Sequence, residues 1–160
     1  MKFGCDGFIG VLVVLALLVL SGFIPDAVAA DSIRKIEESE LDAKIGVKNN
    51  HLVMVFMAAW CAPCIDELPT LNKLNKKFKN QGLEIIGISI DLDGPDAMQP
   101  VVDQLKVNFS VYWYGEKAVE KFALFAIPML LLVKEGKIVE RIHGRRPESF
   151  LNEKFLNFLK

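Results

Sequence analysis

The sequence LVMVFMAAWCAPC, at residues 52–64, joins an unbroken apolar run to a pair of cysteines. The apolar run from Leu52 to Ala59 is typical of a strand that is buried on both faces of a parallel sheet. Cys61 and Cys64 follow directly, and Pro63 between them favours the first turn of a helix, where a missing N–H costs nothing. This stretch therefore predicts a strand-to-helix junction that carries two thiols at the start of the helix.

A thiol in this position is suited to disulfide exchange. The thiolate is the attacking form, and the unpaired N–H groups and dipole of a helix N-terminus stabilise negative charge on Cys61. Cys64 lies three residues further on and can close a disulfide with it. A purely structural disulfide is the alternative, although closing so short a loop removes little entropy from the unfolded chain.

Other uses of a Cys-x-x-Cys pair find little support in the sequence. Structural zinc usually needs four ligands, and beyond the pair the chain offers only Cys5, His51 and His143. Covalent haem attachment needs a histidine directly after the second cysteine, where this chain has Ile65. We therefore expect no metal site and no cofactor other than the disulfide itself, with both histidines in structural or surface roles.

The first thirty residues indicate export. Lys2 precedes an apolar stretch from Phe8 to Ile24, and the small residues that follow, up to Ala30, suit a cleavage site. The stretch is also close to the length of about 17 to 25 residues that crosses a bilayer, so an uncleaved tether through residues 8–24 is the alternative. We expect residues 1–30 to be a signal peptide or membrane anchor. Residues 31–160 would form one domain in the periplasm or on the outer face of the cytoplasmic membrane.

The charge balance argues against nucleic-acid binding. The chain has 19 Lys and Arg residues against 20 Asp and Glu residues, a formal net charge of −1. Proteins that bind nucleic acids need a basic surplus to neutralise phosphates. The expected domain is also long enough to bury a core without disulfide staples. We therefore expect a monomer that uses its cysteine pair on other proteins rather than as scaffolding.

Strand and helix signals alternate through the expected domain, which predicts an α/β fold. Strands are predicted at Ile33–Ile36, Leu52–Ala59, Leu83–Ile90, Val111–Trp113, Met129–Val133 and Lys137–Ile142. Helices are predicted at Glu40–Lys48, Cys64–Phe78, Asp96–Val107 and Glu116–Leu124, and at the C-terminus over the apolar stripe of Phe150, Leu151, Phe155, Phe158 and Leu159. The cluster Asp91–Pro95 predicts a turn, and Lys134-Glu135-Gly136 predicts a hairpin.

This order of elements, with the cysteine pair at the start of the first long helix, resembles the thioredoxin fold. More narrowly, the chain is similar to exported thiol-disulfide oxidoreductases of the TlpA/ResA type. The narrower resemblance rests on the motif Trp60-Cys61-x-Pro63-Cys64-x-x-Glu67-x-Pro69, on Ile127-Pro128, on Gly144 and on an extra segment around residues 95–113. It implies a central mixed sheet flanked by helices, with a helix and a strand inserted into the common fold.

The resemblance also implies roles for single residues. Cys61 would be the exposed nucleophile and Cys64 the more buried resolving thiol. Glu67 would be a half-buried carboxylate that assists the thiols, because it shares a helix face with Cys64 and burial raises the pKa of a carboxyl group. A solvated surface charge is the alternative for Glu67.

A substrate-binding set follows from the same resemblance. Pro128 would be a cis-proline beside the cysteine pair, Ile127 would pack against the disulfide, and Trp60 would offer an apolar wall, with Pro63 between the cysteines. The chain departs from the family pattern on either side of Pro128, where Ala126 and Met129 stand in place of glycine and threonine. These departures predict an altered fit for the partner.

The function implied is that of an exported disulfide reductase that keeps partner cysteines reduced, including those of apocytochrome c. A thiol electron donor in the membrane or envelope would restore its reduced state. An oxidant or isomerase is the alternative within the same class, because disulfide exchange is reversible. A Cu(I)-binding module that uses the two thiolates is the alternative from a different class.

Overall fold

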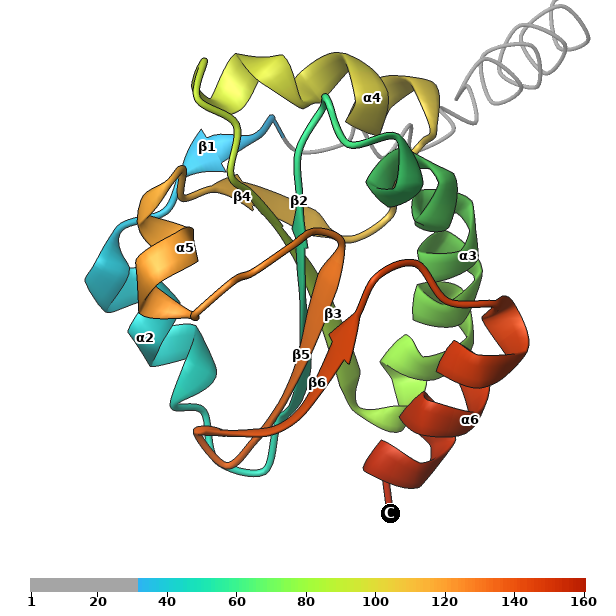
Figure 1. The fold of residues 1–160 in the computed structure, drawn as a ribbon. Helices are drawn as coiled ribbons and strands as arrows, with labels where there is room; N and C mark the ends of the chain where they lie inside the picture. The colour runs from blue at the N-terminus through green and yellow to red at the C-terminus, as the bar shows by residue number, and fades with distance from the viewer. Residues whose placement is uncertain (1–31) are drawn as a thin grey trace, which may run out of the picture.

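The computed structural model describes residues 32–160, which form a mixed sheet of six strands between helices (Figure 1). The predicted signal or anchor segment and Cys5 lie outside the described residues. The strands are β1 (Arg34–Lys35), β2 (His51–Met57), β3 (Leu83–Ser89), β4 (Ser110–Trp113), β5 (Met129–Lys134) and β6 (Lys137–His143). The helices are α2 (Glu38–Ile45), α3 (Ala62–Phe78), α4 (Gln99–Gln104), α5 (Lys117–Lys121) and α6 (Glu148–Phe158). Within residues 32–160, no helix combines the length and the apolar character needed to cross a membrane.

Strand β2 lies at the centre of the sheet, whose strand order is β1-β4-β3-β2-β5-β6. It pairs in parallel with β3, where Val53 faces Ile85, and antiparallel with β5, where Val53 faces Leu132. Apart from His51, every residue of β2 is buried. A central strand covered on both faces has no solvent side, which explains why its sequence is a continuous apolar run.

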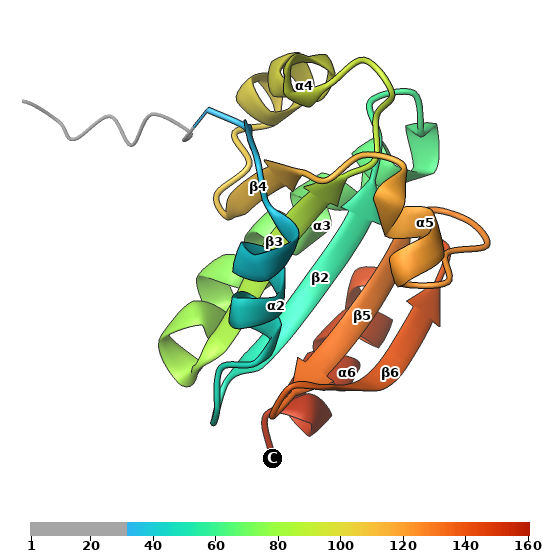
Figure 2. The same ribbon diagram turned by 90° about the vertical axis from the view of Figure 1, so that its left-hand side faces the viewer.

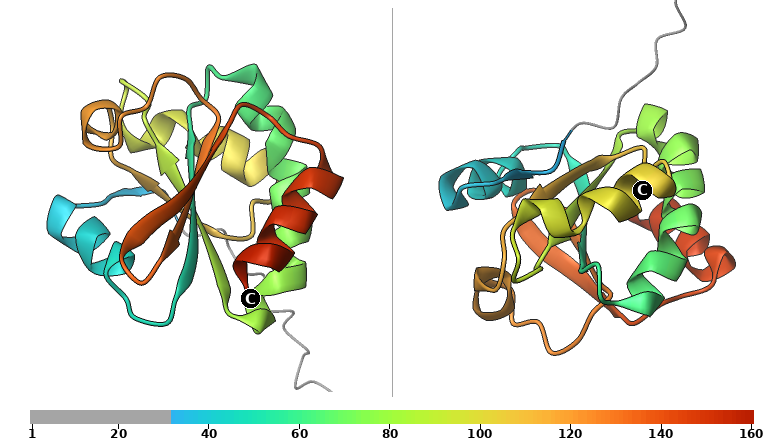
Figure 3. Two further views of the ribbon diagram at one scale, coloured as in Figure 1. Left: turned by 60° about the horizontal axis from the view of Figure 1, so that its bottom comes forward. Right: turned by 90° about the horizontal axis from the view of Figure 1, so that it is seen from above.

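Helices cover both faces of the sheet. Figure 2 shows α2 and α5 on one side, with α3 and α6 behind the strands, and the two views in Figure 3 show the same two layers from below and from above. The inserted segment between β3 and β4 is fixed to α3 by asparagines. Asn75 donates its side-chain amide to the Asn108 carbonyl at 2.8 Å, and Asn72 donates to the Leu105 carbonyl at 3.0 Å.

The predicted mixed sheet with flanking helices and an inserted helix and strand is confirmed, but the inserted helix is shorter than predicted. A helix was expected over Asp96–Val107, and the structure has a 3-10 turn at Pro95–Ala97 followed by α4 at Gln99–Gln104. The chain leaves the helix at Lys106, whose φ of 48° is left-handed and cannot continue a right-handed helix.

The predicted terminal helix is present, but Phe150 departs from the buried face expected of its apolar stripe. Leu151, Phe155 and Phe158 are buried against the core, but Phe150 is 37% exposed. Leu151, Phe155 and Phe158 are spaced four and three residues apart, so they share one helix face. Phe150 directly precedes Leu151 and therefore lies off that face, away from the sheet. Its ring packs instead against two cations, with the Arg146 guanidinium at 5.5 Å and the Lys154 ammonium at 5.6 Å from the ring centroid.

Candidate active site

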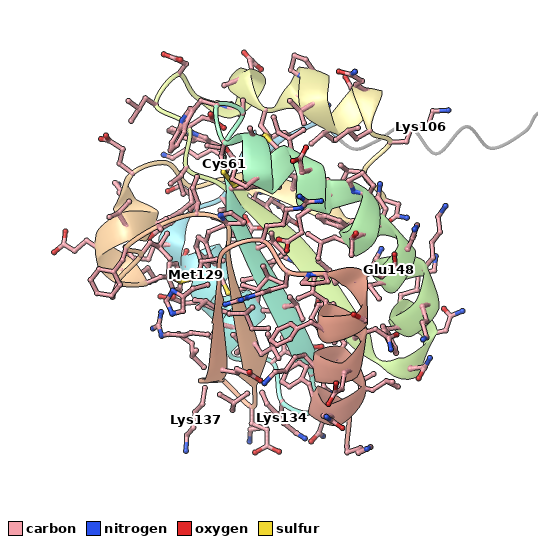
Figure 4. All side chains as sticks on the ribbon, turned by 45° about the vertical axis from the view of Figure 1, so that its right-hand side comes forward. Cys61, Lys106, Met129, Lys134, Lys137 and Glu148 are labelled. Atoms are coloured by element: carbon pink, nitrogen blue, oxygen red, sulfur yellow. A yellow bond between two sulfur atoms is a disulfide. The ribbon has the colours of Figure 1, made fainter. Side chains whose placement is uncertain are left out.

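The two cysteines of the motif lie in the first turn of α3, directly beyond the end of β2. Cys61 is the N-cap residue with extended backbone angles, and its carbonyl accepts hydrogen bonds from the N–H groups of Cys64 at 3.0 Å and Ile65 at 3.1 Å. Figure 4 shows Cys61 where β2 meets α3, at the opposite end of the sheet from Lys134 and Lys137. The predicted strand-to-helix junction is therefore confirmed.

A disulfide joins Cys61 to Cys64, with their Cα atoms 5.3 Å apart. The prediction that Cys61 is exposed is wrong for this oxidised form, because Cys61 is 4% exposed and Cys64 is 2% exposed. The disulfide ties both sulfurs to the first turn of the helix, so neither side chain projects into solvent. The two cysteines differ instead in their surroundings: Cys61 lines a surface pocket, and Cys64 is not among the lining residues.

The pocket beside Cys61 has a volume of about 620 Å³ and is lined by ten residues. They come from four places in the sequence: residues 60–63, residues 124–127, Ile90 and Val119. None of these residues carries a charge. The pocket therefore offers an apolar surface directly against one sulfur of the disulfide.

The predicted substrate-binding set is largely brought together here. Trp60, Pro63 and Ile127 line the pocket with Cys61, and Trp60 is 67% exposed. The Ile127–Pro128 peptide bond is cis, as predicted, but Pro128 is buried and is not part of the lining. The Pro128 carbonyl accepts a hydrogen bond from the Gly144 N–H at 2.8 Å, which fixes this segment to the end of β6.

Glu67 is more deeply buried than predicted. It lies on α3 one turn after Cys64 and is 1% exposed, so the alternative of a solvated surface charge is wrong. Its Oε1 atom accepts the Arg146 N–H at 2.8 Å, whereas Oε2 is buried and has no partner among the described residues. Burial raises the pKa of Glu67 above its usual 4.5, against the opposing effects of the Arg146 N–H and the positive charges of Arg145 and Arg146.

A second buried carboxyl group, that of Asp91, supports the loop before Cys61. From the sequence, Asp91 was predicted only to lie in a turn. Asp91 is 2% exposed, and both of its carboxyl oxygens accept the Ala59 N–H, at 3.0 and 3.2 Å. The Ser89 hydroxyl donates to Asp91 Oδ2 at 2.8 Å, and the Trp113 indole N–H donates to the Asp91 carbonyl at 2.8 Å. Asp91 thus links the Cys61 loop to β3 and β4.

The two histidines lie away from the pocket. The His51 ring packs edge-on against Phe158 with centroids 5.0 Å apart, and burial lowers its pKa. His143 is exposed at the end of β6. Within residues 32–160, no group of three or more His, Cys, Asp or Glu side chains is arranged to hold a metal ion.

Known proteins match most of this chain in sequence. Residues 24–142 match the AhpC/TSA family. One curated relative is the thiol-disulfide oxidoreductase ResA of Bacillus thuringiensis (strain Al Hakam), which is 36% identical over 121 residues. The match covers 74% of this chain and 65% of that protein. ResA of Bacillus subtilis (strain 168) is 30% identical over 129 residues, which cover 79% of this chain and 68% of that protein.

Solved structures show the same fold. A putative thiol:disulfide interchange protein DsbE from Chlorobium tepidum superposes with a TM-score of 0.66 at 23% identity. The match covers 82% of this chain and 100% of that chain. At this identity the likeness establishes the fold alone, and it confirms the predicted thioredoxin fold. The chain thus spans the whole of that structure but only about two thirds of the ResA relatives.

Proposed function

The chain belongs to the AhpC/TSA family, and from that premise we propose that it is an exported thiol-disulfide oxidoreductase that reduces disulfides in partner proteins. The observation that carries the proposal is the Cys61–Cys64 disulfide in the first turn of α3, beside an apolar pocket that only Cys61 of the pair lines. Relatives named thiol-disulfide oxidoreductase support the reaction class. The reaction needs no cofactor other than the two thiols.

The reaction begins from the reduced pair and proceeds in two exchanges. The Cys61 thiolate, stabilised by the helix N-terminus, attacks one sulfur of the partner disulfide, and the second partner sulfur leaves as a thiolate that takes up a proton. The Cys64 thiolate then attacks the Cys61 sulfur, which restores the Cys61–Cys64 disulfide and releases the first partner sulfur. Two electrons pass to the partner, and a thiol donor must return them.

Glu67 is suited to accept the proton of the Cys64 thiol. It lies one helical turn away on the same face, and one oxygen of its carboxyl group accepts the Arg146 N–H. The other oxygen has no partner within residues 32–160 and can accept a proton. A carboxyl group with a raised pKa exchanges protons near neutral pH more effectively than an ordinary surface glutamate. We assign Glu67 the role of proton acceptor for the resolving thiol.

The cellular setting is part of the proposal and rests on the sequence. Lys2, the apolar stretch at residues 8–24 and the small residues before Asp31 support export, with the leader either cleaved or kept as a tether. The domain would act as a monomer in the periplasm or at the outer face of the cytoplasmic membrane. Its partners would include apocytochrome c, and its donor would be a membrane or envelope thiol protein.

Two measurements on the wild-type protein test the reaction class and the direction of electron transfer. We expect the full-length chain, reduced beforehand, to cleave the disulfides of insulin, measured as precipitation of the freed B chain. We expect a reduction potential near about −270 mV, as in reducing thioredoxins, rather than near about −120 mV, as in strong oxidants. The potential is measured by equilibrating the cysteine pair with known ratios of reduced and oxidised glutathione.

Each result bears on a different part of the proposal. No cleavage of insulin would contradict the assignment to thiol-disulfide exchange. Cleavage combined with a potential near that of the strong oxidants would keep the reaction class and overturn the reductase direction. Tight binding of Cu(I) without any exchange activity would support the metal-binding alternative instead.

The buried carboxyl group of Glu67 predicts a particular dependence of stability on pH. Because its pKa in the folded protein is raised, the folded state binds more protons than the unfolded state at pH values above 4.5. The free energy of unfolding contributed by this group is therefore highest at or below pH 4.5 and falls as the pH rises through the higher folded value. In Glu67→Gln this fall should be absent, because glutamine does not ionise and its Oε1 can still accept the Arg146 N–H. Urea unfolding of both proteins across a pH series from about 4 to about 8 measures the difference.

Asp66→Asn is the matched control, since it removes an exposed carboxyl group one residue earlier on the same helix. It should leave the pH dependence close to that of the wild type. A Glu67→Gln variant with the wild-type pH dependence would show that Glu67 does not hold a raised pKa. The proposed proton transfer is measured separately, as slower release of a partner peptide from its mixed disulfide with Cys61 in Glu67→Gln than in Asp66→Asn.

A further inference from the structure

Two large aromatic side chains beside the Cys61 pocket are left in solvent. Phe125 is 88% exposed and Trp60 is 67% exposed, and both line the pocket. Val119, on another wall, is 43% exposed. A cluster of exposed apolar side chains around a concave surface is typical of a binding site in a soluble domain.

The exposure of Phe125 is imposed by well-anchored neighbours. Leu124, directly before it, is 8% exposed, and its N–H donates to the Val119 carbonyl at 2.9 Å. The Phe122 carbonyl accepts the Arg141 guanidinium at 2.7 Å, and Ile127 packs against the core on the other side. The backbone on either side of Phe125 is thus held, and its ring is presented at the pocket.

The reaction determines what must enter this pocket. A partner sulfur has to come within about 2.05 Å of the Cys61 sulfur to form the mixed disulfide. Neighbouring residues of the partner follow at about 3.8 Å per Cα, so the side chain next to the reacting cysteine falls within reach of the same pocket. A charged side chain placed there would lose hydration without gaining an oppositely charged partner, because no lining residue is charged.

We propose that this pocket selects partner proteins in which a large apolar residue adjoins the reacting cysteine, and that Phe125 determines the selectivity. This inference rests on the proposed function and adds a substrate class to it. The occupant is an apolar segment of a partner protein that carries a disulfide. The charged residues Arg145 and Arg146 belong to the neighbouring loop over Glu67 and take no part in the lining.

The test isolates the first exchange step. The full-length chain with Cys64→Ser, and with Cys5→Ser to remove the remaining thiol, is mixed with short peptides whose single cysteine forms a disulfide with thionitrobenzoate. The Cys61 thiolate attacks the peptide sulfur, forms the protein–peptide disulfide and releases coloured thionitrobenzoate. Three peptides differ only in the residue beside the cysteine, which is leucine, lysine or glutamate.

We expect the leucine peptide to react about tenfold faster than either charged peptide, a ratio equivalent to about 1.4 kcal/mol. Phe125→Ala should reduce this ratio to near unity. Phe150→Ala is the matched control, because it removes another partly exposed phenylalanine that lies outside the pocket, and it should keep the wild-type ratio.

Each other result overturns the inference in a recognisable way. Equal rates for the three peptides would overturn the inference and leave the proposed function standing. Equal rates are also the result expected if the chain's own N-terminal segment or a second copy already covered the pocket. A faster glutamate peptide would point to attraction by the neighbouring arginines instead of apolar selection. A tenfold ratio that survives Phe125→Ala would remove Phe125 as its determinant. No reaction with any peptide would overturn the proposed function, and the inference would fall with it.

Discussion

Replacing Cys61 with serine is expected to lower the rate of insulin reduction by at least about a thousandfold, since removing a catalytic nucleophile can cost a factor of about 10⁶. A serine hydroxyl is not ionised near neutral pH and cannot form a disulfide bond, so neither exchange step can take place. Cys64→Ser should behave differently, because Cys61 can still attack but nothing then displaces the partner. The measurement is insulin reduction by the wild type and both variants, with non-reducing gels to detect mixed disulfides.

The contrast between the two variants is the decisive control. Cys64→Ser should accumulate a covalent complex with partner proteins in the cell envelope, and Cys61→Ser should not. Insulin reduction that survives in Cys61→Ser would contradict the assignment of Cys61 as the nucleophile. A complex trapped by Cys61→Ser and not by Cys64→Ser would reverse the two roles, and identification of the trapped protein would name the partner.

The features that could be predicted from the sequence are those fixed by neighbouring residues. The strand before the cysteines was predictable because a central strand must be apolar on both faces, and the start of α3 because Pro63 favours a first helical turn. Glu67 could be placed near Cys64 because residues three apart share a helix face. The depth of its burial could not be predicted, since it depends on the loop around Arg146, which is 79 residues away in the sequence.

The residues that were missed depend on distant contacts. Asp91 stands in a cluster of turn-forming residues, and its role is visible only when β3 brings it beside Ala59, which is 32 residues earlier. Phe125 is a single aromatic residue in a connection, with no periodic pattern to mark it. Its place in the pocket depends on the fold, which brings the segment before Pro128 beside the start of α3. The 4% exposure of Cys61 was missed as well, because the resemblance implied an exposed nucleophile.

Removing the Asp91 carboxyl group is expected to destabilise the protein by about 3 kcal/mol, because it leaves the buried Ser89 hydroxyl and the part-buried Ala59 N–H without their acceptor, and an unpaired buried donor costs about 1–3 kcal/mol. In Asp91→Ala the Ala59 N–H and the Ser89 hydroxyl both lose their acceptor. Asp91→Asn should cost less, since its remaining side-chain oxygen can still accept one of these donors. Urea unfolding of the oxidised full-length proteins measures the loss, and hydrogen exchange at the Ala59 amide shows whether it is centred on the loop before Cys61.

Asp93→Ala is the appropriate control, because Asp93 is exposed in the same turn and none of the side-chain hydrogen bonds of the described residues involves it. Its free energy of unfolding should stay within about 0.5 kcal/mol of the wild type. If Asp91→Ala were equally stable, the buried carboxyl group would not be holding the loop. If it were destabilised while the Ala59 amide stayed protected, the loss would lie in the contact with Ser89 alone. A destabilised protein with a freely exchanging Ala59 amide is the expected result, because the segment between β2 and Cys61 is then tied to β3 through Asp91.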